Sequence, residues 1–198
     1  MSVKVSIIVP IYNTAKFLSR CLDSLRTQSL MDIEIICVND KSTDNSSTVL
    51  LQYSKYDSRI KIINNEVNRG AAFSRNVGIR NACGEYIGFC DSDDFVDKEY
   101  FKYLYDLHGC YDIIRGIRVI GYKNSHAKNQ YGCIVPSIIR RQFLLDNHLY
   151  FPVNKKVGED STFKRWCYNH TNKIFEVPDK GIYYHYIKRA GSLSNYDM

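Results

Sequence analysis

The first ninety residues alternate between short apolar runs, rich in β-branched side chains, and longer stretches of helical periodicity. Apolar runs of this length indicate buried strands, and recurrence of apolar residues every three or four positions indicates helices. Strand, helix and strand in such short steps are typical of parallel strands joined by right-handed crossovers, so we expect an α/β fold. The expected strands cover residues 3–9, 33–38, 60–63 and 85–90, and the expected helices 14–28, 42–56 and 71–82, the last with Gly84 as its C-cap.

The second half of the chain is less regular. We expect helices over residues 98–107, 137–147 (with Ser137 as a cap) and 158–170, and strands over 112–122, 174–177 and 182–186. We find no repeat, linker or domain boundary, and 198 residues suit one compact domain. We therefore expect a single domain over 1–198. No apolar run approaches the ~18 residues of a membrane-spanning helix.

The distribution of charge and the number and spacing of the cysteines indicate which partners and which cellular compartment suit this chain. Residues 1–97 carry 11 Lys and Arg against 12 Asp and Glu, whereas the rest carry 16 against 9. A basic half of this kind suits an anionic partner or is an ordinary solvated surface. The seven cysteines form no Cys-x-x-Cys pair, which argues against a zinc site and predicts buried free thiols in a reducing, cytoplasmic protein.

Polar side chains follow the expected strands at their carboxyl ends, where open parallel sheets bind ligands. Asp40 follows the second strand, and three carboxylates (Asp91, Asp93 and Asp94) follow the fourth. Turn chemistry alone explains Asp40 equally well. Three carboxylates within four residues repel one another unless a positive charge offsets them, and a divalent cation is the simplest candidate.

Several segments, in this order and spacing, resemble a family 2 glycosyltransferase with the GT-A fold. The likeness is close over residues 3–100, loose over 137–195 and absent over 108–136. The matching segments are VSIIVPIYN (5–13), VNDKSTD (38–44), NRG (68–70), SRNVG (74–78), GEYI (84–87), DSDD (91–94) and GED (158–160).

The resemblance implies a Rossmann-like, mostly parallel central sheet flanked by helices, with a smaller mixed region on the acceptor side. Residues 1–97 would bind the nucleotide sugar and 98–198 the acceptor. Within the first part, the resemblance implies that Asp40 accepts a hydrogen bond from uracil and that the base pocket is shaped by Pro10 and Tyr12. An ion pair with the acidic loop is a second, compatible role for Arg75. The implied nucleotide-binding residues are Pro10, Tyr12, Asp40, Asn68, Arg75, Asp91 and Ser92.

The resemblance also implies a metal site and a catalytic base. Asp91 and Asp93 match the acids of the family's Asp-x-Asp motif, in which Asp93 would bind Mg²⁺ or Mn²⁺ bridging the diphosphate. Asp94 either caps the next segment or is a direct ligand. Asp160 would be the general base, with Glu159 orienting the site or acceptor; ordinary helix N-terminal chemistry is the alternative for this pair.

Two further features concern the edges of this site. His185 is either a third metal or phosphate contact or a packed residue of a tyrosine-rich strand, and Lys188, Arg189 and Gly191 belong to a candidate closing loop. Lys41 stands where the family usually has Gly, which predicts an altered turn after Asp40 or an added charge near the donor.

The resulting expectation is an inverting hexosyl- or N-acetylhexosaminyltransferase that uses a UDP-sugar and Mg²⁺ or Mn²⁺. Its acceptor would be a hydroxyl of a saccharide, glycolipid or glycoprotein glycan, with no nucleic-acid partner. Peripheral attachment to a membrane through the basic second half is a further expectation. The alternatives are a non-catalytic nucleotide- or polyanion-binding module and transfer to a polyprenyl phosphate carrier.

Overall fold

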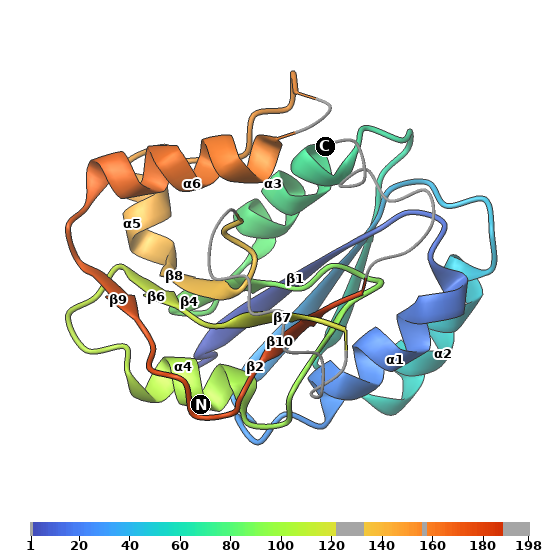
Figure 1. Cartoon of the computed structure of the whole chain (residues 1–198). Coiled ribbons are helices and arrows are strands. Elements are labelled where there is room, and N and C mark those ends of the chain that lie inside the picture. Colours follow the sequence, from blue (N-terminus) through green and yellow to red (C-terminus); the bar gives the residue numbers. More distant parts are fainter. Residues whose placement is uncertain (1, 122–132, 156–157, 188–198) are drawn as a thin grey trace.

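The computed structural model of the chain describes residues 2–121, 133–155 and 158–187 (Figure 1). Its centre is a seven-stranded sheet in the order β3-β2-β1-β4-β8-β6-β9. β1 pairs in parallel with both β2 and β4, and β2 with β3, which confirms the mostly parallel α/β architecture. The strands are β1 (Val5–Ile11), β2 (Ile33–Asn39), β3 (Ile60–Asn64), β4 (Tyr86–Phe89), β6 (Ile113–Arg115), β8 (Ser137–Arg140) and β9 (Ile174–Glu176).

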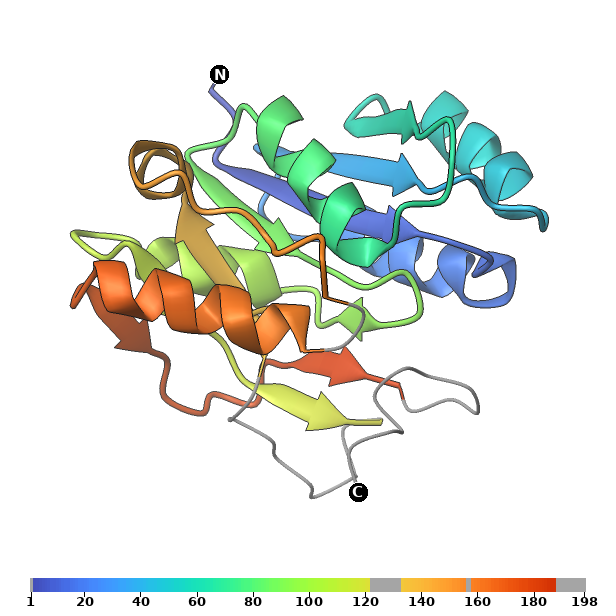
Figure 2. The same ribbon diagram turned by 90° about the horizontal axis from the view of Figure 1, so that it is seen from above.

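Helices cover both faces of this sheet. Figure 1 shows α3, α5 and α6 above the sheet and α1 and α4 below it, with α2 beside α1. The view from above in Figure 2 shows α3 and α6 lying across the same face. The helices are α1 (Ala15–Arg26), α2 (Ser46–Tyr56), α3 (Ala71–Asn81), α4 (Tyr100–Asp106), α5 (Arg141–Asp146) and α6 (Glu159–His170).

The strand order reverses at β1. The chain moves outward from β1 through β2 to β3 and then returns to place β4 on the other side of β1. Such a switch point leaves a crevice at the carboxyl ends of the two central strands, where open α/β sheets bind ligands. The loops after β1, β2 and β4 all open onto this edge, so the fold brings the expected binding segments together.

The second half departs from the expected elements in two places. The strand expected over 112–122 is two strands: β6 stays in the main sheet, while β7 (Arg118–Ile120) joins a three-stranded sheet in the order β5-β10-β7. In that small sheet, β5 is Phe95–Val96 and β10 is Tyr184–Tyr186. The break falls at Gly116, where a Cβ would lie within 2.9 Å of the Pro136 carbonyl oxygen, so a larger residue would not fit.

The helix expected over 137–147 is also wrong in its first turn. Ser137 caps no helix, because residues 137–140 form β8, antiparallel to both β4 and β6. Ile138 and Ile139 are fully buried between those strands, and the helix begins at Arg141. Two adjacent apolar residues occur in central strands and in helices alike, so the sequence could not separate the two structures here. The expected helix therefore began too early.

Gly84 does not cap α3, which ends at Asn81. A Cβ on Gly84 would approach the Ser6 backbone nitrogen to 2.6 Å, and its own N–H donates to Ser6 Oγ at 2.8 Å. The glycine therefore permits close approach of the loop to β1.

Next to this contact lies a buried carboxylate, Glu34 of β2. It accepts hydrogen bonds from the Cys83 backbone at 2.8 Å, from Lys61 Nζ at 2.6 Å and from the Ser6 hydroxyl. Burial acts to raise the pKa of Glu34, but these three donors outweigh it and hold the pKa at about 2.

In the ranges that the structure describes, every helix is too short or too polar to cross a membrane.

Candidate active site

Three carboxylates from distant parts of the chain converge on one buried arginine. Arg75 projects from the middle of α3, and its side chain is 4 % exposed. Its Nη2 donates to Asp91 Oδ1 at 2.8 Å, just after β4, while its Nη1 lies 3.0 Å from Asp160 Oδ1 and 3.3 Å from Glu159 Oε1, at the first turn of α6. Phe151 lies under the guanidinium, 5.2 Å from ring centre to Cζ. The fold thus joins the acidic loop to α6 through Arg75.

The electrostatics of this group suit a proton acceptor. Burial raises the pKa of Asp160 to about 6; Arg75 opposes the rise, whereas Asp91 and Glu159 add to it. The pKa of Arg75 is itself raised, because attraction to the three carboxylates outweighs the cost of burying its charge. A carboxyl with a pKa near 6 is mostly ionised at pH 7 yet binds a proton readily, as a general base requires.

Protein groups offset part of the negative charge of the acidic loop, for which a divalent cation was the simplest candidate from the sequence. Arg75 already offsets the charge of Asp91. Asp94 is 1 % exposed and points the other way, accepting from the Tyr184 hydroxyl at 2.7 Å and from the Ile187 backbone at 2.8 Å. Burial and the neighbouring acids raise its pKa well above the usual range. Asp94 therefore fastens the loop to β10 instead of capping the next segment.

The Tyr184 hydroxyl is a contact that the sequence analysis missed. It accepts the Asp91 backbone N–H at 3.0 Å while donating to Asp94, so one buried side chain fixes the backbone of the acidic loop at two points. The two partners lie about ninety residues away in the chain, and one tyrosine among sixteen carries no mark of this role.

The donor set at this loop fits a divalent cation that completes its coordination with substrate oxygens. Arg75 binds only Oδ1 of Asp91, and Asp93 is partly exposed on the same loop. Among the described residues there is no group of three or more metal-ligating side chains. One or two carboxylates plus phosphate oxygens is the way Mg²⁺ is usually held, so these residues suit a cation that binds together with a diphosphate.

The expected nucleotide residues lie around the carboxyl ends of β1 and β2. Pro10 is buried within β1, Tyr12 is 47 % exposed after it, and Asn68 is exposed in the β3–α3 loop. Asp40 is almost fully buried, and its carboxylate accepts from the backbone N–H groups of Arg69 and Gly70 at 3.0 and 2.7 Å. Asp40 also accepts from Asn65 Nδ2 at 2.7 Å. Asp40 thus orders the loop that holds Asn68, and its carboxylate already accepts from three protein N–H donors.

Two neighbours of Asp40 and Asp91 are held by local contacts. Ser92 is buried and accepts from the Thr14 hydroxyl at 2.9 Å, so it ties the acidic loop to the start of α1. Lys41 has a φ of 61°, the left-handed conformation that glycine adopts most readily. A residue with a side chain is strained in this conformation, so the turn after Asp40 carries backbone strain at Lys41.

His185 takes the packed arrangement. Its Nδ1 lies 2.9 Å from the Gly121 carbonyl oxygen and its Nε2 3.1 Å from Asp97 Oδ1, and its ring stacks on Phe95. Both nitrogens are occupied by protein oxygens, so a metal or phosphate would have to displace one of them. Lys188, Arg189 and Gly191 lie outside the described residues.

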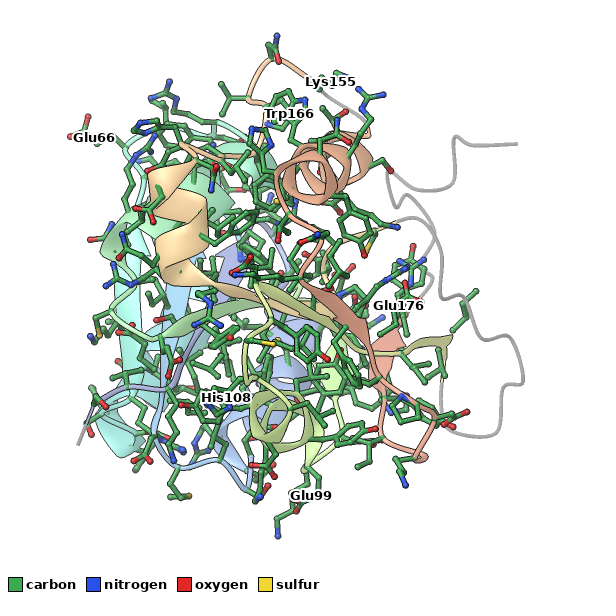
Figure 3. All side chains as sticks on the ribbon, turned by 90° about the vertical axis from the view of Figure 1, so that its left-hand side faces the viewer. Glu66, Glu99, His108, Lys155, Trp166 and Glu176 are labelled. Carbon is green, nitrogen blue, oxygen red and sulfur yellow. The ribbon has the colours of Figure 1, made fainter. Side chains whose placement is uncertain are left out.

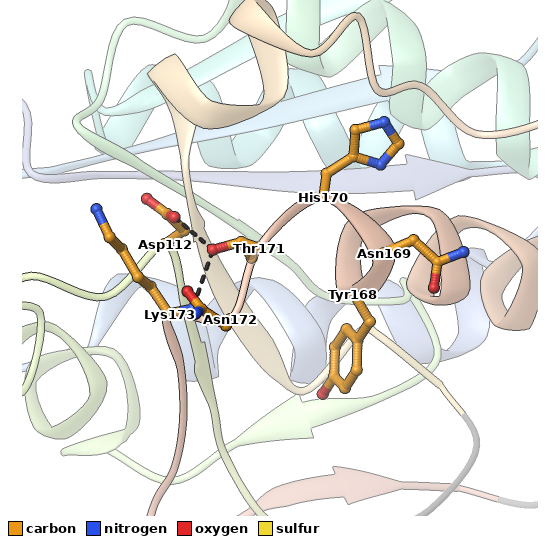
Figure 4. A pocket seen from close by; sticks show the side chains of 7 residues that line it. All are labelled: Asp112, Tyr168, Asn169, His170, Thr171, Asn172 and Lys173. Atoms are coloured by element: carbon orange, nitrogen blue, oxygen red, sulfur yellow. Dashed lines mark hydrogen bonds between the residues drawn. The ribbon is translucent and has the colours of Figure 1, made fainter.

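A shallow pocket of about 610 Å³ lies at the opposite end of α6 from Asp160 (Figure 4). Its lining belongs to the last turn of α6 and to the following turn, where Thr171 Oγ1 donates to Asp112 at 2.7 Å. The 12 residues of α6 separate it from the carboxylate group by roughly 17 Å. This pocket is not part of the candidate active site.

Comparison with known proteins is consistent with this geometry. The sequence model described as glycosyl transferase family 2 matches residues 6–169. A poly(ribitol-phosphate) beta-glucosyltransferase of Bacillus spizizenii is 36 % identical over 95 % of this chain, and the uncharacterized glycosyltransferase EpsJ of Bacillus subtilis is 32 % identical over 90 % of it. The chain spans 33 % and 60 % of the lengths of these two relatives.

Solved structures agree with the sequence matches. A crystal structure of Staphylococcus aureus TarS in complex with UDP-GlcNAc superposes with a TM-score of 0.86 at 29 % identity, covering 98 % of this chain and 61 % of the other. A Pyrobaculum calidifontis mannosyltransferase in complex with GDP-Man and Mn²⁺ shares the fold, with a TM-score of 0.74. It is 16 % identical, and the match covers 93 % of this chain and 56 % of the other. The GT-A architecture is therefore confirmed, and the chain belongs to glycosyl transferase family 2.

Proposed function

We propose that the chain catalyses transfer of a hexosyl or N-acetylhexosaminyl group from a uridine diphosphate sugar to a hydroxyl group, with inversion at the anomeric carbon. The observation that carries the proposal is the convergence of Asp91 and Asp160 on Arg75. Asp91 follows β4 and Asp160 lies 69 residues later, in the first turn of α6, yet both bind one guanidinium at the carboxyl edge of the sheet. A buried carboxyl with a raised pKa at a ligand-binding edge is typical of a catalytic site.

Asp160 is the general base in this proposal. Its carboxylate accepts the proton of the acceptor hydroxyl as that oxygen attacks the anomeric carbon, and the bond from this carbon to the diphosphate oxygen breaks in the same step. Arg75 keeps Asp160 ionised near neutral pH and holds it beside Asp91. Glu159, bound to the same guanidinium, orients the first turn of α6.

The nucleoside diphosphate lies between the β1, β2 and β4 loops in this proposal. Tyr12, Pro10 and the Asp40-ordered loop with Asn68 form the base side, and the Asp91–Asp93 loop faces the diphosphate. Mg²⁺ or Mn²⁺ bound there would stabilise the negative charge that develops on the departing diphosphate. The uridine preference rests on the relatives, because TarS has been crystallised with UDP and with UDP-GlcNAc.

The acceptor class also rests on the relatives. Two of them are named as poly(ribitol-phosphate) glycosyltransferases, one of B. spizizenii and one of S. aureus. We propose that this chain likewise glycosylates a surface polymer, and that glycolipid or polyprenyl phosphate acceptors are alternatives to be tested beside it.

The test is the release of nucleoside diphosphate from a panel of UDP- and GDP-sugars in the presence of Mg²⁺ or Mn²⁺, with and without acceptors. We expect metal-stimulated UDP release from at least one UDP-sugar and a product of inverted anomeric configuration by NMR. Binding of a UDP-sugar without any turnover would support the non-catalytic module, and retention of configuration would refute the single displacement.

A further inference from the structure

The loops that follow β1 and β2 are joined to each other by hydrogen bonds. The side chain of Asn13, after β1, accepts the Thr43 N–H at 2.8 Å, and its amide nitrogen donates to Thr43 Oγ1 at 3.1 Å. In the other direction, the carboxylate of Asp44 accepts the Ala15 N–H at 3.0 Å and the Ser46 N–H at 2.9 Å. We call these contacts of Asn13 and Asp44 the loop junction. The loop junction ties together the starts of α1 and α2, which lie side by side in Figure 1.

Tyr12 and Asp40, two residues of the proposed base side, lie directly beside the loop junction. The Ile11 carbonyl oxygen accepts the Asp40 N–H at 2.8 Å, which ties the chain to the β2–α2 loop just before Tyr12. Asn13 ties the chain to the same loop just after Tyr12. The exposed tyrosine ring is therefore carried on a backbone that is fixed at both neighbouring residues, and a ring held in this way is suited to stack on a planar base.

Both loops also contain a residue in the left-handed backbone conformation. Three non-glycine residues in the described ranges have a positive φ, and two of them are Asn13 at 52° and Lys41 at 61°. Such conformations persist where the surrounding contacts over-determine them, and they are frequent in ligand-binding loops. The loop junction supplies contacts of this kind, so we infer that the two loops keep one arrangement before a ligand binds.

The charge at the loop junction is unsuited to a phosphate group. In many nucleotide-binding α/β folds, the N–H groups at the start of a helix bind phosphate. Here the Ala15 N–H of α1 donates to Asp44, and the preceding Thr14 N–H donates to Ser46 Oγ at 3.1 Å. Burial acts to raise the pKa of Asp44, but hydrogen bonds from Ser46 and Ala15 outweigh it and lower the pKa. The ionised carboxylate repels a phosphate, so the uncharged base is the part of a nucleotide that suits this end of the site.

The loop junction and the acidic loop lie on opposite sides of β1. In the sheet, β2 and β3 lie on one side of β1, and β4, which Asp91 follows, lies on the other. Figure 3 shows Glu66, in the loop after β3, and Lys155, just before α6, well apart across the upper end of the molecule. A nucleoside diphosphate bound across the end of β1 would thus place its base at the loop junction and its diphosphate at the acidic loop.

We propose that Asn13 and Asp44 are positioning residues for the nucleobase of the donor, which hold Tyr12 and Asp40 in the arrangement that receives uracil. This proposal rests on the proposed function, because it assigns a role within the same donor site.

The test is calorimetric titration of Asn13→Gly with UDP and with GDP, each with and without Mn²⁺. Glycine adopts a φ of 52° readily, so the change removes the side-chain bonds of Asn13 without straining the turn. We expect Kd for UDP to rise about 10-fold and the preference for UDP over GDP to fall, because fewer molecules hold the competent loop arrangement. The factor by which Mn²⁺ tightens UDP binding should stay unchanged, since the acidic loop is not altered. With a UDP-sugar, KM should rise while kcat stays within about 2-fold.

Three further variants separate positioning from a general loss of structure. Asn13→Asp keeps the acceptor for the Thr43 N–H and tolerates the same φ, so it should bind UDP within about 3-fold of the unaltered chain. Asn45→Gly is the matched control, because the side chain of this neighbouring asparagine makes no capping bond to α2, and it should leave UDP binding unchanged. Asp44→Ala removes the other half of the loop junction and should reproduce the pattern of Asn13→Gly.

Three results would overturn this inference while leaving the transferase proposal intact. They are an unchanged UDP affinity in Asn13→Gly, equal rises in Kd for UDP and GDP, and an unaltered chain that binds the two nucleotides equally. Loss of the Mn²⁺ effect in Asn13→Gly would also contradict it, because the change would then act on the acidic loop. Failure of the unaltered chain to bind UDP and to release it from any donor would instead overturn the proposed function.

Discussion

Replacement of Arg75 by methionine tests how the candidate site is held together. The change keeps most of the side-chain volume but removes the cation that binds Asp91, Glu159 and Asp160 at 2.8, 3.3 and 3.0 Å. Removal of one partner from a buried ion pair typically costs 3–5 kcal/mol, roughly a fifth or more of the stability of an ordinary domain. We therefore expect Arg75→Met to lower the free energy of unfolding by about 3–5 kcal/mol at pH 8.

The loss should depend on pH in a predictable direction. Without Arg75, the pKa of Asp160 should rise further above about 6, because the guanidinium now acts to lower it. The folded variant then binds protons more tightly than the unfolded chain, so its stability falls as pH rises. The destabilisation should be larger at pH 8 than at pH 5, and adding Asp160→Asn to Arg75→Met should recover part of it, since one buried charge is removed.

Urea unfolding followed by circular dichroism at pH 5, 6.5 and 8 measures these differences. Arg80→Met is the matched control, because Arg80 is an exposed residue of the same helix that lies over Tyr150; it should change stability by less than about 0.5 kcal/mol. A loss below about 1 kcal/mol for Arg75→Met at pH 8, or a loss without pH dependence, would refute the idea that Arg75 holds three ionised carboxylates.

Three further changes have defined outcomes. Lys41→Gly should raise the free energy of unfolding by about 1 kcal/mol, since it relieves a left-handed φ of 61°, and an unchanged or lower value would show that the turn is not strained. Glu34→Gln should make the stability of the fold less sensitive to acid. Because the folded pKa of Glu34 is about 2, its ionised carboxylate stabilises the fold at neutral pH, and this contribution is lost as pH falls from about 4.5 toward 2. The free energies of unfolding of wild type and variant, measured by urea titration, should therefore converge at pH 2. Tyr184→Phe removes the hydroxyl that binds Asp91 and Asp94, so the metal-dependent affinity for UDP, measured by calorimetry, should fall about 10-fold. An unchanged affinity would show that this hydroxyl only fills space.

The periodicity of the first half was enough to predict its strands and helices, because each parallel strand is a mostly apolar run that ends in turn-forming residues. The resemblance named Asp40, Asp91 and Asp160 as acids of the site; the structure brings Asp91 and Asp160 onto one guanidinium, and the roles of all three stay predictions. Their partners were harder to foresee. The contacts of Arg75 to α6 join residues more than eighty positions apart, and no local pattern encodes them.

The same limit explains the errors in the second half. β6, β8 and β9 are only three or four residues long, so their periodicity is too brief to separate a strand from a helical turn. The acidic loop was expected to need a divalent cation for charge balance, yet Arg75 and the inward turn of Asp94 already supply part of that balance. Counting charges along a sequence shows that the acidic loop needs a positive charge nearby, but it does not show which group supplies that charge.

The most direct test of the account is the rate of UDP formation by Asp160→Asn, measured against pH beside the unaltered chain. The unaltered chain should gain rate as pH rises through about 6, because the base must lose its proton. The rate of Asp160→Asn should be roughly 10²–10⁴-fold lower and should no longer rise with pH near 6, while the variant still binds UDP. An asparagine variant that retains the full rate and the same rise near pH 6 would show that another residue accepts the proton, and would contradict the central claim.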